Sequence, residues 1–182
     1  MAVNELERNR SEKVESRQIE LAEETLTKFY EAEDVFRVIR SGLGYRGEGS
    51  SRDKSDTTHL SDEVNARIDS IYSTIERMRK YDDFFASISL MVARVKALFG
   101  AEVCDAFLEI VRTRNELILA TQFMMEDAAR PPADQDDMRE WRNVRFGSFS
   151  KKDDLHMKLE ESKSKLEKAL LPIVRSRLNL DK

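Results

Sequence analysis

The sequence predicts an all-α fold, a mostly antiparallel four-helix bundle with a glycine-rich loop between the first and second helices. Two observations predict it. The 182 residues include only 6 glycines and 3 prolines, and 36% of the residues are charged, which is typical of long helices. Apolar residues also recur every three or four positions along four stretches, the spacing of helices that bury one face. A chain of this length most simply forms one domain, residues 1–182.

The first predicted helix runs from about Val3 to Arg40 and has two different halves. Its second half has a continuous apolar face that includes Leu26 and Phe29. Residues 1–18 are polar by contrast, and we expect a helical extension that either frays or lies along a partner chain. Residues 41–61 follow and contain four glycines, which end helices and disfavour new ones, so we expect a flexible loop there.

The second and third predicted helices form a pair. The second begins after Ser61, a good N-cap residue, and ends at Gly100. The third runs from near Ala101 to about Ala128, where Arg130 and two prolines stop it. Because the connection between them is short, these helices should be antiparallel neighbours.

The last predicted helix follows an irregular connection at residues 129–149. It begins after Ser150, with Asp153 placed to cap its first turn. Pro172 should kink this helix or loosen its last turn, because proline has no amide hydrogen to donate.

Three charged residues occupy positions where the helical pattern calls for apolar side chains. They are Glu33, Asp82 and Arg114, one in each of the first three helices. We expect a buried ion pair between Arg114 and one of the two acids, because such a pair fixes the register of packed helices. The alternative is that Arg114 binds an anion or takes part in catalysis.

The basic and aromatic stretch REWRNVRFGSFSKK is a second candidate site, for nucleic acid or another phosphate. Guanidinium and aromatic groups together suit phosphate backbones and unstacked bases, and they also suit an anionic membrane surface. Alternatively, the aromatic residues close one end of the bundle while the arginines are solvated or pair with the preceding acidic helix. The candidate contacts are Arg139, Trp141, Arg142, Arg145, Lys151 and Lys152.

The sequence predicts no metal site, no cofactor and no small-molecule substrate. A di-metal helical bundle needs Glu-x-x-His motifs, and neither His59 nor His156 follows a glutamate at that spacing. Phosphate-binding glycine motifs are absent from the sequence. The single cysteine, Cys104, favours a small core residue and is compatible with a reducing compartment.

Two resemblances bear on function. Arg52 and His59 are similar in spacing to the Arg and His of HEPN-type helical ribonucleases, and RTRNEL resembles those proteins too. Here the motif lies in the predicted loop, and no histidine follows RTRNEL at residues 117–121, which implies at most a degenerate relative. The stretches LAEETLTKFYEAEDVFRVIRSGLGYRGEG and LFGAEVCDAFLEIVRTRNELILA resemble a set of uncharacterised bacterial helical proteins, whose members often carry a preceding membrane-spanning helix. That resemblance implies a helical fold and brings no activity with it.

Composition favours a cytoplasmic, non-enzymatic interaction protein. The net charge of −4 does not suit a polycation that binds nucleic acid. No signal peptide is visible, and no stretch approaches the roughly eighteen consecutive apolar residues that span a bilayer.

We expect self-association, or binding to a protein partner, through residues 1–18 or a shared apolar face of the first or second helix. Truncation of residues 1–18 should then abolish binding. The alternative is a nucleic-acid-binding or HEPN-like ribonuclease factor of bacterial defence. In that case charge reversal at Arg142 and Arg145 should abolish binding.

Overall fold

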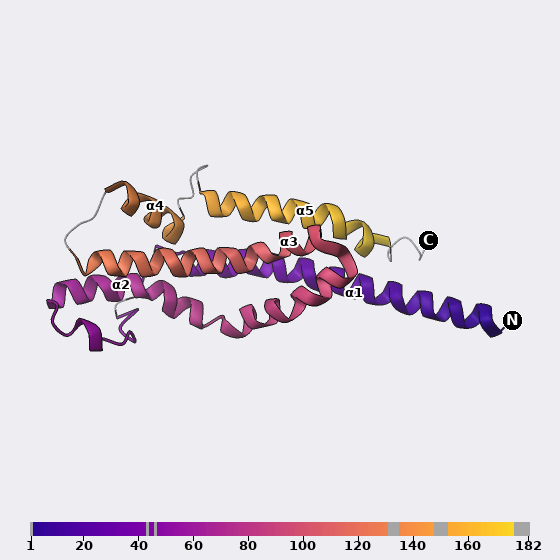
Figure 1. Cartoon of the computed structure of the whole chain (residues 1–182), viewed down its shortest axis with the longest axis horizontal. Coiled ribbons are helices and arrows are strands. Elements are labelled where there is room, and N and C mark those ends of the chain that lie inside the picture. The colour runs from indigo at the N-terminus through magenta and orange to yellow at the C-terminus, as the bar shows by residue number, and fades with distance from the viewer. Residues whose placement is uncertain (1, 43, 46, 131–134, 148–152, 177–182) are drawn as a thin grey trace.

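The computed structural model describes residues 2–42, 44–45, 47–130, 135–147 and 153–176. Over these residues the protein is all-α, with helices packed against one another and no strand (Figure 1). The elements are α1 (Ala2–Ile39), the short 3-10 helix η1 (Ser55–Thr57), α2 (Asp62–Arg79), α3 (Asp82–Ala128), α4 (Gln135–Phe146) and α5 (Asp154–Ser176).

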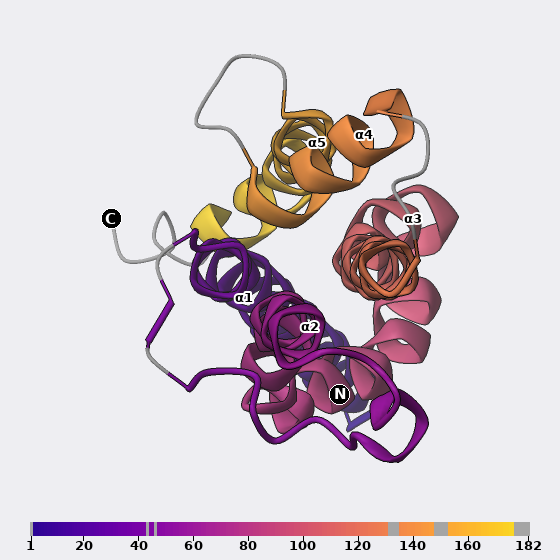
Figure 2. The ribbon, with the colours of Figure 1, turned by 90° about the vertical axis from the view of Figure 1, so that its left-hand side faces the viewer.

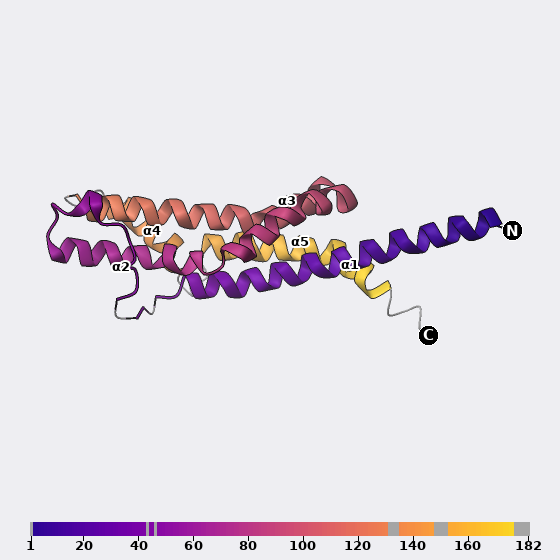
Figure 3. The same ribbon diagram turned by 90° about the horizontal axis from the view of Figure 1, so that it is seen from below.

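Helix α1 has the two halves that the sequence predicts. From Ile19 onward its apolar face is buried, with Phe29 fully inaccessible to solvent. Residues 7–17 are all exposed. This part of α1 projects beyond the other helices, at the end of the molecule where α3 reverses direction (Figures 1 and 3).

The predicted second helix is interrupted, which corrects the prediction of one continuous helix to Gly100. It begins as expected, because the Ser61 side chain accepts a hydrogen bond from the Val64 amide at 3.3 Å. However, α2 ends at Arg79, and the backbone of Tyr81 is not helical, with φ −114° and ψ 17°. A new first turn then begins at Asp82. Acidic residues are favourable there because a helix N-terminus carries a partial positive charge.

Helix α3 reverses direction at Gly100. This residue has φ 86° and ψ −176°, a conformation that is essentially open only to glycine. The segments on either side, residues 82–99 and 101–128, therefore lie antiparallel, as predicted (Figures 1 and 3). The Cys104 thiol reaches back across the turn to within 3.8 Å of the Val92 carbonyl oxygen. Cys104 itself is buried.

Residues 129–149 include a helix, α4, where the sequence predicted an irregular connection. Its sequence QDDMREWRNVRF is mostly polar, so apolar periodicity does not reveal it. Helix α5 begins one residue after Asp153, whose carboxylate accepts a hydrogen bond from the His156 amide at 3.3 Å. It continues past Pro172 to Ser176, so of the two predicted effects of this proline, a kink or a loose last turn, the helix does not show the loose turn.

The core has a larger and a smaller part. The larger part lies mainly between α1, α3 and α5 and includes Phe29, Phe107 and Leu166. The smaller part joins α2 to the end of α3 through Ile71 and Met124 and is flanked by α4. Helix α4 packs against α3, and along the length of the molecule it lies ahead of the start of α5 (Figures 1 and 2).

Candidate functional site

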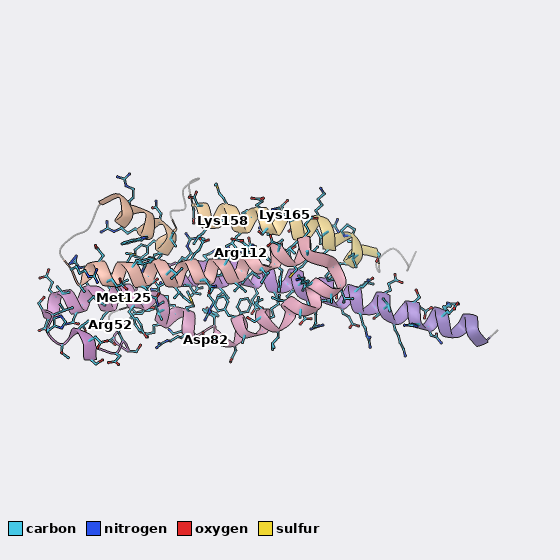
Figure 4. All side chains as sticks on the ribbon, in the orientation of Figure 1. Arg52, Asp82, Arg112, Met125, Lys158 and Lys165 are labelled. Atoms are coloured by element: carbon cyan, nitrogen blue, oxygen red, sulfur yellow. The ribbon has the colours of Figure 1, made fainter. Side chains whose placement is uncertain are left out.

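The α3 reversal brings Arg114 and Asp82 together, two of the three charged residues that the sequence singles out. The Arg114 Nη2 and Asp82 Oδ1 atoms are 3.6 Å apart. The pair is not buried, contrary to prediction, since the two side chains are 33% and 59% exposed. The interruption before α3 explains the difference, because it places Asp82 at a helix start rather than on a packed face (Figure 4).

Glu33 lies elsewhere and pairs with α5. Its carboxylate accepts a hydrogen bond from Lys163 Nζ at 2.9 Å. Desolvation opposes the charge on Lys163, but hydrogen bonds to Glu160 and Glu33 outweigh it and raise the pKa of Lys163. Glu33 is therefore part of an α1–α5 contact and not the partner of Arg114.

Arg114→Ala should lower the free energy of unfolding by only about 0–1 kcal/mol, the usual effect of a surface pair. A buried pair would have cost several times more. Urea unfolding of the variant beside the wild type measures the difference. A loss of 3 kcal/mol or more, as roughly expected for a buried pair, would contradict this assignment.

The basic residues of α4 do not form one surface. Arg139 and Arg142 are exposed, but Arg145 is only 5% exposed. Trp141 is half-buried and stacks on Phe123, with 5.4 Å between ring centroids. Arg145 is therefore not free to contact a nucleic acid, and Phe123 covers part of the Trp141 ring. The last two candidates, Lys151 and Lys152, lie outside the described residues.

Arg145 binds α2 instead. Its Nε donates to the Thr74 hydroxyl at 2.8 Å, and its Nη2 donates to the Ser70 carbonyl oxygen. Burial lowers the pKa of Arg145 to about 10, and the nearby charge of Arg77 lowers it as well. Charge reversal at Arg145 would therefore disturb the α2–α4 contact and could not serve as a test of nucleic-acid binding.

Arg77 forms a buried ion pair that the sequence did not predict. Its Nε and Nη2 atoms donate to the two carboxylate oxygens of Glu48, each at 2.6 Å. Both side chains are 8% exposed. The hydrogen bond from Arg77 is the main cause that lowers the pKa of Glu48. This pair attaches the loop after α1 to α2.

A second buried pair joins α1 to the start of α5. Arg40 Nη2 lies 2.7 Å from Asp153 Oδ1, and Arg40 Nε donates to the Val144 carbonyl oxygen at 3.0 Å. The partners are 113 residues apart, so no local pattern in the sequence could have revealed them. The pairs Arg77–Glu48 and Arg40–Asp153 connect segments of the fold. Their side chains are buried and already paired, so we assign them a structural role.

The loop at residues 41–61, which we expected to be flexible, makes specific contacts with α2. The Gly49 amide donates to Glu76 Oε2 at 2.6 Å. Arg52 donates to Asp69 Oδ1 at 3.1 Å and to Asn65 Oδ1 at 2.9 Å (Figure 4). His59 is exposed, and the structure gives it no contact with Arg52 among the described residues. Arg52 therefore has a structural role in this loop, which does not favour the ribonuclease-type pairing.

The first segment of α3 has an apolar face that points to solvent. We call the exposed residues Ala86, Leu90, Ala93 and Ala97 the outer face of α3. Leu90 is 78% exposed. By length and composition α3 is apolar enough to cross a membrane, and only 28% of its most apolar eighteen-residue stretch is buried. A core helix of a soluble protein and a membrane span can have the same apolar composition. The exposure of its side chains is therefore what marks this segment as apolar surface.

Neither metal-binding geometry nor similarity identifies a function. Among the described residues, no group of three or more His, Cys, Asp or Glu side chains could hold a metal ion. No family model, curated protein or solved structure matches the chain.

Proposed function

We propose that this chain is a non-enzymatic helical interaction protein that self-associates through the outer face of α3 and the projecting part of α1. One observation carries this proposal: the outer face of α3 is a strip of apolar side chains exposed to solvent, with Leu90 78% exposed. Apolar surface of this kind is favourable only when another surface covers it.

The side chains of the outer face suit packing against an identical helix. From Ala86 to Ala97 the face extends about 16 Å at 1.5 Å per residue. Three of its four members are alanines, which let two helix backbones approach closely, and Leu90 provides a larger apolar side chain between them. A second copy offers the same uncharged face, so a two-fold pair would bring no like charges of this face together.

The projecting part of α1 would enlarge this interface. A standard interface buries about 800 Å² on each partner, which is more than one short helical face provides. Residues 7–17 lie in α1 with every side chain exposed, although helices of this length are marginal in water without tertiary packing. Residues 1–18 carry four acidic and four basic side chains, so two copies need not repel each other.

We further propose that the helices form an antiparallel four-helix bundle. Its four helical segments would alternate in direction. The first is α1, the second is α2 together with residues 82–99, the third is residues 101–128, and the fourth is α5. Helix α4 would be an addition at one end. In this arrangement the outer face of α3 lies on the second helical segment, on the side that faces away from the core.

Leu90→Glu should convert a dimer to a monomer that still folds, because the side chain is already in water in the single chain. Its melting temperature should fall only to that of dilute, monomeric wild type, since the variant loses the stabilisation from association alone. Sedimentation velocity and thermal unfolding measure the two effects. Met157→Glu is the matched control, since Met157 is 53% exposed on α5, and it should remain dimeric. A wild-type protein that stays monomeric at every soluble concentration would overturn the proposal. A Leu90→Glu variant that stays dimeric would overturn the assigned face.

A further inference from the structure

We propose that the cleft between α2 and the second segment of α3 binds a small amphipathic monocarboxylate, one with a single carboxylate on an apolar body. This site is separate from the outer face of α3 and does not depend on self-association. The cleft has a volume of about 310 Å³, within the usual range of small-ligand sites. Figure 4 labels two of its lining residues, Asp82 and Met125.

The polar side of the cleft contains an arginine whose hydrogen-bonding capacity is incompletely used. Arg114 Nε is buried and has no hydrogen-bond partner among the described residues. Its closest carboxylate, Asp82, is 3.6 Å from Nη2, too far for a good hydrogen bond. The Arg114 side chain is nevertheless 33% exposed and lines the cleft, so an anion there could form a charge-assisted hydrogen bond with the accessible part of its guanidinium.

A second guanidinium gives the cleft an excess of positive charge. Arg79 lies over the ring of Tyr72, with 5.5 Å from its Cζ to the ring centroid. The structure gives Arg79 no ion pair within its described residues. The lining therefore has two arginines, Arg79 and Arg114, against one acid, Asp82, a net charge of +1. This balance favours a monoanion over a dianion, which would face repulsion from Asp82.

The remaining lining suits an apolar body. Met78, Ile118 and Met125 contribute aliphatic and thioether surface. Methionine side chains are flexible and adapt to ligands of varied shape. A carboxylate can accept two parallel hydrogen bonds from a guanidinium, and it could replace Asp82 at Arg114 while its chain covers these residues.

The test compares octanoate with 1-octanol, which has the same chain length without the charge. Protein labelled with ¹³C at the methionine methyl groups reports binding at Met78 and Met125 by NMR titration. We expect saturable shifts of both methyl signals with octanoate and much weaker effects with 1-octanol. Arg114→Gln should weaken octanoate binding about tenfold or more, the effect of one lost charge-assisted hydrogen bond.

Two further variants make the result specific to the cleft. Arg112→Gln is the matched control on the same helix, because Arg112 pairs with the exposed Asp105 and with Glu109 and does not line the cleft. It should bind octanoate like the wild type. Ile118→Trp should fill the cleft and remove binding, and it decides the question if Arg114→Gln fails to fold. Absence of saturable binding to the wild type would overturn the proposal, as would equal binding of octanol or unchanged affinity in Ile118→Trp.

Discussion

Replacing Arg77 with methionine should lower the free energy of unfolding by about 3–5 kcal/mol, because Glu48 would remain buried without its partner. The two hydrogen bonds of 2.6 Å are lost, and so is the one from Arg77 to the Ser41 carbonyl oxygen. The end of α1, the loop and α2 would then lose a shared anchor. Urea unfolding followed by circular dichroism measures the change.

The double variant Arg77→Met, Glu48→Met is the control for this effect. It removes both charges, so its loss of stability should be smaller than the sum of the two single losses. If Arg77→Met alone lowers the free energy of unfolding by less than about 1 kcal/mol, the ion pair behaves as a surface pair and its structural role is wrong.

The same ion pair has a defined pH dependence. Arg77 lowers the pKa of Glu48 in the folded protein below its ordinary value of 4.5. A lowered folded pKa means that the stabilisation is complete above pH 4.5 and is lost as the pH falls through the lower, folded pKa. The stability difference between wild type and Arg77→Met should therefore shrink in acid. Repeating the unfolding experiment across this range checks the direction.

Gly49→Ala should lower the free energy of unfolding by about 3 kcal/mol or more, among the larger effects of single substitutions. Gly49 has φ +85°, and an added Cβ would lie 1.8 Å from the Asp69 carbonyl oxygen. This contact is with backbone, so no side-chain rotation can relieve it, and the loop would have to move away from α2. The hydrogen bond from the Gly49 amide to Glu76 would break with it.

Gly47→Ala separates this steric effect from backbone strain. Gly47 has nearly the same φ, +86°, but an added Cβ there would meet nothing within 4 Å. It should cost only the strain of a left-handed residue, about 1–2 kcal/mol. Equal losses for the two variants, measured by urea unfolding, would show that the loop does not pack against α2 as described.

Local patterns were sufficient to predict much of the fold. The apolar spacing that includes Leu26 and Phe29 predicted the buried half of α1, and Ser61 predicted the start of α2. Gly100 predicted the reversal in α3, because glycine alone is readily accommodated in that backbone conformation. Each of these signals lies within a few residues of the feature that it predicts.

Features that depend on distant partners could not be predicted in this way. The apolar period continues across residues 80 and 81, so it gave no sign that α2 ends there and that Asp82 would be exposed. The burial of Arg145 depends on Ser70 and Thr74, more than 70 residues earlier in the chain. The basic and aromatic sequence of α4 therefore predicted an exposed binding surface, whereas Arg145 is buried against α2.

Cross-linking through the outer face of α3 tests self-association most directly. The variant Leu90→Cys would be made with Cys104→Ala, so that the new thiol is the only one, and treated with a short bismaleimide. If two copies meet through this face, a covalent dimer should form efficiently at low protein concentration, and Met157→Cys in the same background should give little. Equal, weak cross-linking of both variants would show that the outer face does not meet a second copy.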